Sequence, residues 1–168
     1  DTETIVQLIA KSKRQSMIDK IVDALFQIQG GYALVMLTNN ILIGARDPFG
    51  IRPLILGKLK NSYILTSETC ALDIIGGKFV REIENGEIVV IENENIKSIK
   101  PFPERKVRPC VFEYIYFSRP DSILNNKCAY DYRKNFGYQL AKESRVDADI
   151  VVPVPDSGVP AAIGYSQK

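Results

Sequence analysis

Few residues in this sequence are of types that commonly act in catalysis, and the residue types that are missing exclude several kinds of reaction. There are three cysteines, Cys70, Cys110 and Cys128, and no histidine. Without histidine, these residues cannot form a Cys-His pair, a Ser-His-Asp triad or a histidine-bearing zinc site. Cys70 has no base close to it in the sequence. We therefore interpret it as a small buried residue at the start of a helix and not as a nucleophile.

A glycine-bearing turn late in the sequence is a second candidate site. It ends the string VVPVPDSG at residues 151–158, which follows a predicted helix. We predict a buried strand over residues 149–154 and a further helix after Gly158. Ser157, Gly158 and the free N–H groups of that helix could approach a phosphate or pyrophosphate oxygen. The residues alone leave open a simple turn that binds nothing.

The string RDPFGIRPL at residues 46–54 is the most distinctive part of the first half. Pro48 and Pro53 fix φ, and Gly50 permits a sharp turn. Asp47 lies between two arginines, and a guanidinium group can hold a carboxylate through two hydrogen bonds. Taken alone, this pattern indicates a rigid structural loop with a salt-bridge network.

An aromatic segment follows in the second half, PCVFEYIYFSRPDS at residues 109–122. The alternation of Phe112, Tyr114 and Tyr116 predicts a strand over residues 111–117 with the three rings on one face. Such a face can pack like that of any ordinary strand. It can also line an apolar path, and the residues alone do not choose between the two.

Composition limits the class of protein. The 168 residues are 45% hydrophobic, which is ample for a core, and the net charge is only +2 with scattered basic residues. We therefore expect a soluble protein that does not bind nucleic acid. No apolar run approaches the roughly 20 residues that span a bilayer. Three widely spaced cysteines argue against a disulfide framework, so we predict a reducing compartment, the cytoplasm.

The predicted elements divide the chain in two. Helices are expected over residues 1–10, 15–29 and 70–75, and strands over residues 32–38, 41–46, 54–59, 63–66, 79–83, 87–91 and 96–99. The charged, proline-punctuated residues 100–108 suit no packed element, so we place the domain boundary there. Beyond it, a helix over residues 132–144, the strand and the last helix follow an α/β pattern. The start at Asp1, without Met or a signal peptide, indicates a piece of a longer protein.

These strings together resemble one family. Residues 46–54 match a signature of amidotransferase domains whose nucleophile is an N-terminal cysteine, and the opening DTE is similar to that family's Ser-Asp-Ser/Thr-Glu segment. Residues 109–122 match the interdomain segment of the amidophosphoribosyltransferases, which glucosamine-6-phosphate synthase and asparagine synthetase lack. Residues 67–70 and 151–158 continue the resemblance.

The resemblance implies an α+β fold. Residues 1–99 would be the distal part of an N-terminal-nucleophile (αββα) glutamine amidotransferase domain. Residues 100–168 would be the start of an α/β type I phosphoribosyltransferase domain. The implied reaction moves ammonia from glutamine to 5-phosphoribosyl pyrophosphate (PRPP) and gives 5-phosphoribosylamine, the first step of de novo purine synthesis. The family is typically oligomeric, and Mg²⁺ accompanies PRPP.

The resemblance also assigns residues to roles. Asp1 would hold the α-ammonium of glutamine, although by its sequence it could equally cap a helix. Phe112 and Tyr116 would line a dry path for ammonia. Cys110 falls where one branch of the family places the first ligand of a 4Fe-4S cluster, while another branch keeps this cysteine without a cluster. Ser157 and Gly158 would lie near phosphate.

The family's nucleophilic cysteine and main PRPP loop have no counterpart in the sequence, so we expect the 168-residue chain by itself to be catalytically inactive. Two other interpretations remain open. One is an N-terminal-cysteine amidotransferase with a different ammonia acceptor, such as a sugar. The other is a non-catalytic regulatory module on the amidotransferase scaffold.

Overall fold

The structure, a computed structural model, describes residues 2–168. Contacts within the chain separate two compact units. One comprises the residues up to Pro53 together with Ile83–Arg108, and the other comprises Leu54–Glu82 together with Pro109–Lys168. These units describe packing, and the domain boundary between residues 99 and 100 stays a prediction.

The first unit is built on a four-stranded antiparallel sheet with the order β1-β2-β6-β7. Its strands are β1 (Ala33–Leu37), β2 (Ile41–Arg46), β6 (Ile88–Glu92) and β7 (Asn95–Ile99). The register sets Ile43 opposite Val90 and Ala45 opposite Ile88. Because side chains alternate along a strand, these four apolar residues share one face of the sheet.

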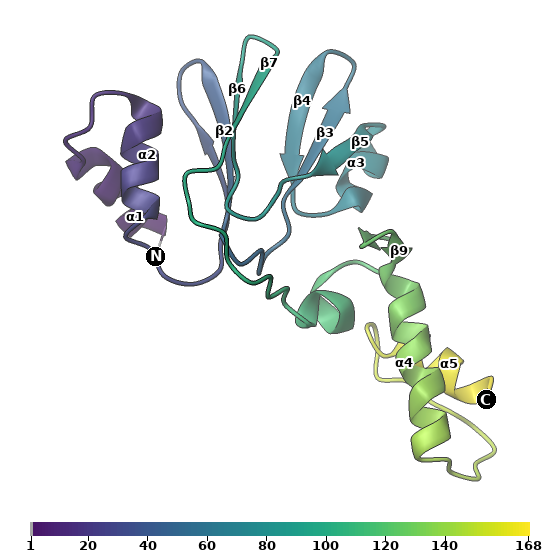
Figure 1. Ribbon diagram of the computed structural model, residues 1–168. Coiled ribbons are helices and arrows are strands. Elements are labelled where there is room, and N and C mark those ends of the chain that lie inside the picture. Colours follow the sequence, from purple (N-terminus) through teal and green to yellow (C-terminus); the bar gives the residue numbers. More distant parts are fainter. Residues whose placement is uncertain (1) are drawn as a thin grey trace. The chain divides into compact units, whose positions relative to one another are not determined.

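Two helices, α1 (Thr2–Lys11) and α2 (Met17–Leu25), lie beside this sheet (Figure 1). Ser16 caps α2, because its side chain accepts a hydrogen bond of 3.1 Å from the backbone N–H of Asp19. Ile21 and Leu25 of α2 are buried against Tyr32 and the apolar face of β2 and β6. The helical spacing of apolar residues in this region therefore predicted the core of the unit.

The second unit contains a three-stranded antiparallel sheet with the order β4-β3-β5. Its strands are β3 (Ile55–Leu59), β4 (Ser62–Thr66) and β5 (Lys78–Glu82), and α3 (Thr69–Ile75) follows β4. Gly76 ends α3 in the left-handed conformation, with φ of 70°. Gly57 of β3 lies directly against Leu72 of α3, where an added Cβ would come within 2.4 Å of that side chain.

The same unit contains η1 (Glu113–Phe117), a small hairpin of β8 (Ile123–Leu124) and β9 (Lys127–Cys128), and the helices α4 (Ala129–Glu143) and α5 (Val159–Ser166). α4 and α5 pack directly on each other (Figure 1). A Cβ on Gly137 would lie 1.7 Å from the carbonyl oxygen of Ala161, and one on Gly164 would lie 1.9 Å from that of Lys134. The two helices therefore meet backbone to backbone.

Two predicted strands are wrong. The segment predicted as a strand at 111–117 instead contains η1, a short π-helical turn, in which the Ser118 N–H donates to the Glu113 carbonyl at 3.4 Å. Residues 149–154 have no regular structure, and Val152 and Val154 are 80% and 82% exposed. A strand needs a partner for its backbone, and no strand within residues 2–168 pairs with either segment.

The predicted hairpins of the first hundred residues and the helix around Cys70 are confirmed, as are the helices on either side of residues 149–158. None of the helices within residues 2–168 is long and apolar enough to cross a membrane.

Candidate functional site

Asp47 organises the loop at residues 46–54. Its side chain is completely buried. The carboxylate oxygens accept hydrogen bonds of 2.9 to 3.3 Å from the backbone N–H groups of Tyr32, Phe49, Ile51 and Arg52. A buried carboxylate thus satisfies backbone donors that would otherwise have no acceptor, which makes the loop rigid.

The Arg46 side chain closes the same loop through carbonyl groups. Its Nε donates to Arg52 O at 2.9 Å and its Nη1 to Ile83 O at 2.6 Å. Gly50 has φ of 64°, and an added Cβ would lie 2.0 Å from the Asn85 side chain. The loop is therefore rigid, as predicted, and backbone amides and carbonyls supply much of its support.

Glu68, just before α3, joins segments that are far apart in the sequence. Its Oε2 accepts hydrogen bonds from Arg119 N–H at 2.7 Å and from the Ser122 hydroxyl at 2.6 Å. Next to it, Thr69 Oγ1 accepts a hydrogen bond of 2.8 Å from Ile123 N–H. These partners are 51 or 54 positions apart in the chain. We call Glu68, Thr69, Ser122 and the backbone of residues 119–123 the Glu68 junction.

Cys70 is enclosed in this junction. It is 3% exposed, and its Sγ lies 3.2 Å from Ser122 Oγ and 3.7 Å from Glu68 Oε2. Burial raises the pKa of the Cys70 thiol; the Ser122 hydrogen bond lowers it, and the charge of Glu68 raises it further. A protonated, enclosed thiol is a poor nucleophile. The prediction that Cys70 is buried is confirmed.

Arg133 of α4 binds the backbone of η1. The side chain is 3% exposed. Its Nε donates to Tyr114 O at 3.0 Å and its Nη2 donates to Ser118 O at 2.6 Å. The Ser118 hydroxyl in turn donates to Glu113 Oε2 at 3.0 Å. Both ends of η1 are thereby tied to a buried guanidinium.

The two residues predicted for an ammonia path, Phe112 and Tyr116, lie at η1 and are 54% and 65% exposed. Phe117 stands between them, with ring centroids 5.8 Å from Phe112 and 6.2 Å from Tyr116. We call these three residues the aromatic cluster. The predicted strand would have placed Phe117 on the opposite face, so sequence reasoning missed it, and the helical backbone is what brings it in.

Cys110 is half-buried and not in a disulfide. Among residues 2–168, no three His, Cys, Asp or Glu side chains come together as a metal site. A 4Fe-4S cluster takes four thiolates in the usual case, so its other ligands would come from outside these residues. The assignment of Cys110 to a cluster stays a prediction.

Ser157 and Gly158 lie in a tight turn that leads into α5. Gly158 N–H donates to Val154 O at 3.2 Å, and Val159 N–H donates to Asp156 O at 3.3 Å. An added Cβ on Gly158 would lie 2.5 Å from Val154 O, so the turn requires glycine. Two of the N–H groups expected to face a phosphate are thus used inside the turn. The phosphate role of Ser157 and Gly158 stays a prediction.

The predicted glutamine contact of Asp1 lies outside residues 2–168, which are the residues that the structure describes. It also stays a prediction.

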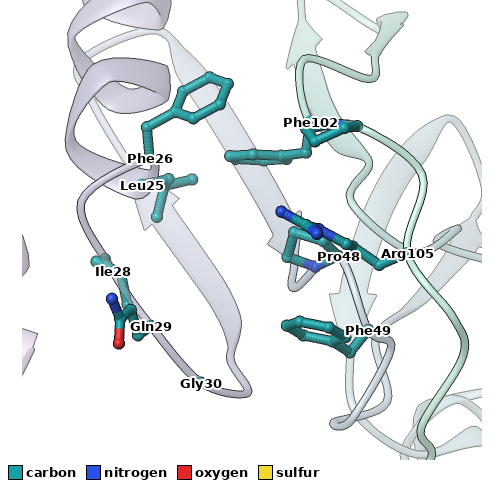
Figure 2. Close-up of a pocket in the computed structure, with 10 residues that line it drawn as sticks. Leu25, Phe26, Ile28, Gln29, Gly30, Pro48, Phe49, Phe102 and Arg105 are labelled. Carbon is teal, nitrogen blue, oxygen red and sulfur yellow. The ribbon is translucent and has the colours of Figure 1, made fainter.

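A cavity of about 390 Å³ lies beside the Asp47 loop in the first unit (Figure 2). It is lined by Leu25, Phe26, Ile28, Gln29, Gly30, Pro48, Phe49, Phe102, Pro103 and Arg105. Its walls are apolar except for Gln29 and Arg105. The rings of Phe26 and Phe102 are 4.8 Å apart. Phe102 therefore packs well, although it belongs to the stretch predicted to suit no packed element.

A protein-family model described as "Glutamine amidotransferase domain" matches residues 1–73. The match includes the Asp47 loop and Glu68, and it ends before the segment that Glu68 binds.

Curated relatives match along the whole chain. The amidophosphoribosyltransferase of Rhizobium etli is 51% identical, and the alignment covers 100% of this chain and 35% of the relative. The enzymes of that name from Synechocystis and Bacillus subtilis are 49% and 42% identical, and each alignment covers 99% of this chain and 35% of the relative. The chain thus spans about a third of the length of the curated relatives it matches.

Solved structures agree with the sequence comparison. The B. subtilis glutamine PRPP amidotransferase, complexed with ADP and GMP, superposes with a TM-score of 0.95 at 42% identity, covering 99% of this chain and 37% of that one. A structure described as the allosteric regulatory enzyme of purine biosynthesis gives a TM-score of 0.94 at 43% identity, with 99% and 36% covered. By sequence and by fold, this chain belongs to the amidophosphoribosyltransferase family.

Proposed function

We propose that this protein takes part in the transfer of glutamine-derived ammonia to PRPP. The products are 5-phosphoribosylamine, glutamate and pyrophosphate, and the reaction begins de novo purine synthesis. One observation carries the proposal: 99% of the chain superposes on the B. subtilis PRPP amidotransferase with a TM-score of 0.95.

In this proposal, residues 1–99 are the distal part of the glutamine amidotransferase domain, in keeping with the family model that matches residues 1–73. Residues 100–168 are the start of a type I phosphoribosyltransferase domain. Support comes from α4 and α5, which pack on each other and match the helices predicted on either side of residues 149–158.

The aromatic cluster supports a role in moving ammonia. Neutral ammonia must reach its acceptor before it gains a proton or escapes to water, and apolar side chains exclude water. Phe112 and Tyr116, joined by Phe117, present such a surface. Glutamine and PRPP are the small-molecule partners, and Asp1 would hold the glutamine ammonium.

At the other substrate, Ser157 and Gly158 would lie near the PRPP phosphates, and Mg²⁺ would arrive with PRPP. If the protein carries a 4Fe-4S cluster, Cys110 would supply one thiolate to it. The free cysteines suit a reducing compartment, which we take to be the cytoplasm, and we expect a homo-oligomer.

The test is to express the full-length gene product and measure pyrophosphate release from PRPP with and without glutamine. Release that requires both substrates supports the proposal. Glutamine hydrolysis without consumption of PRPP would move the protein to an amidotransferase with another acceptor. The 168-residue chain alone, assayed for glutamate release, should show no turnover.

A further inference from the structure

We propose that Glu68 is a positioning residue for ammonia transfer: it holds the segment that carries the aromatic cluster in a fixed place relative to α3. The inference rests on the proposed function, since it concerns how that reaction keeps its ammonia. Glu68 itself touches no substrate in this account. It acts through residues 118–122.

Several hydrogen-bond donors meet at one carboxylate oxygen of Glu68. Glu68 Oε2 receives the backbone N–H of Arg119, the hydroxyl of Ser122 and, at the longer distance of 3.7 Å, the thiol of Cys70. Ser122 is fully buried, and Glu68 Oε2 at 2.6 Å is a nearer and stronger acceptor for its hydroxyl than Cys70 Sγ at 3.2 Å. Hydrogen bonds to an ionised carboxylate are shorter and about twice as strong as those between neutral groups.

The Glu68 junction is connected to η1 through Arg119 and Ser118. Arg119 directly follows Ser118, which ends η1. Ser118 is 2% exposed, its hydroxyl donates to Glu113 Oε2, and its carbonyl accepts from Arg133 Nη2. Arg133 also binds the carbonyl of Tyr114. Glu68 is therefore connected to η1 by its hydrogen bond to Arg119, by the peptide bond between Arg119 and Ser118, and by the hydrogen bonds that Ser118 makes with Glu113 and Arg133.

The aromatic cluster is partly exposed to solvent. Its rings are 49% to 65% exposed, and Phe117 is in ring contact with both Phe112 and Tyr116. Half-exposed rings are fixed less firmly by packing than buried rings, so the hydrogen bonds of the η1 backbone contribute to their position. Glu68 and Arg133 both supply that support, and Glu68 lies in the stretch matched by the amidotransferase family model.

The inference predicts a specific defect. If Glu68 is lost, the two chemical steps should survive, but ammonia should escape between them. Small displacements of positioning groups can reduce a rate by up to about 100-fold. We expect the ratio of pyrophosphate released to glutamate formed to fall by about three- to tenfold in Glu68→Ala. Glu68→Gln keeps one acceptor oxygen and should fall less.

The experiment uses the full-length gene product. Glutamate and pyrophosphate are measured together with glutamine and PRPP present, and pyrophosphate is measured again with PRPP and ammonium chloride in place of glutamine. Glu84→Gln is the matched control, because it makes the same chemical change at an exposed ion pair with Lys100. That variant should keep the wild-type ratio.

A lower ratio in Glu68→Ala, with ammonium-dependent release and glutamine hydrolysis close to wild type, supports the inference. An unchanged ratio in both Glu68 variants overturns it. If Glu68→Ala loses every activity and Glu68→Gln keeps the wild-type ratio, Glu68 serves folding alone and the inference is wrong. Failure of the proposed function looks different, because the wild-type protein would then release no pyrophosphate from PRPP.

Discussion

Asp47 and Glu68 are carboxylates that gather several hydrogen-bond donors, but they gather them over different distances along the chain. The Asp47 carboxylate takes backbone N–H groups that lie 2, 4, 5 and 15 positions away. Glu68 takes donors that lie 51 and 54 positions away. Asp47 is fully buried, whereas Glu68 is half-buried.

This difference in sequence separation distinguishes two uses of the same functional group, the carboxylate. A local carboxylate shapes its own loop, and its removal leaves several buried donors without an acceptor. A long-range carboxylate joins segments that lie far apart in the sequence, and water can reach part of it. Stability should therefore depend more on Asp47, and alignment of the joined segments more on Glu68.

The largest effect should come from Asp47→Ala. We expect the free energy of unfolding to fall by about 3–5 kcal/mol, because backbone N–H groups around a buried site lose their acceptor. Asp47→Asn keeps one oxygen and should lose about half as much. Urea unfolding of the purified protein measures both. A loss below about 1 kcal/mol in Asp47→Ala would contradict the view that this carboxylate holds the loop.

Arg133→Met should have the next largest effect. It leaves the carbonyls of Tyr114 and Ser118 without their donor, while the methionine fills much of the volume. We expect a loss of about 2–3 kcal/mol. Hydrogen exchange should quicken at η1 and leave the four-stranded sheet unchanged. Equal acceleration in both regions would show that Arg133 supports the whole protein and not η1.

Glu68→Ala should cost less stability than either change, about 1–2 kcal/mol, because solvent can replace part of what is removed. The amide of Arg119 should exchange faster with deuterium in this variant, as read by mass spectrometry of peptides from residues 118–123. The decisive result is that Asp47→Ala lowers the free energy of unfolding more than Glu68→Ala does. The reverse order would remove the distinction drawn between the two carboxylates.

The smallest effect concerns Cys70 at alkaline pH. Its folded pKa is raised above the unfolded value of about 8.5, so the unfolded chain loses the thiol proton first as the pH rises. The thiol's contribution is complete below pH 8.5 and is lost as the pH rises through the folded pKa. We expect the free energy of unfolding of the wild type to fall more than that of Cys70→Ala as the pH rises above about 8.5, as measured by urea unfolding at several pH values. Parallel pH curves would show that the junction does not perturb the thiol.

Local features of the fold could be predicted from the sequence. Apolar spacing in α2, the turns of the hairpins and Gly76 at the end of α3 each signal their structure within a few residues. The rigidity of the Asp47 loop was also predictable, since Pro48, Gly50 and Pro53 restrict or permit specific backbone angles.

Features that depend on distant partners could not be predicted. The alternation of rings in residues 111–117 fits a strand, but Arg133 and Ser118 stabilise a helical turn there. Nothing near Glu68 in the sequence indicates that Arg119 and Ser122 are its partners. The close backbone contacts of Gly137 with Ala161 and of Gly164 with Lys134 could not be predicted, because a single glycine in a helix usually only lowers its helix propensity.

Because the partners of Glu68 lie 51 and 54 positions further along the chain, the Glu68 junction can form only late in protein synthesis. Arg119 is 51 positions downstream, so a ribosome adding about 5–20 residues per second needs roughly 3–10 s to supply it after Glu68. Until residues 119–123 have been made and have left the ribosome, the Glu68 carboxylate and the Cys70 thiol lack the partners that enclose them in the folded protein. The junction is therefore completed late, after β3, β4 and α3 have been synthesised.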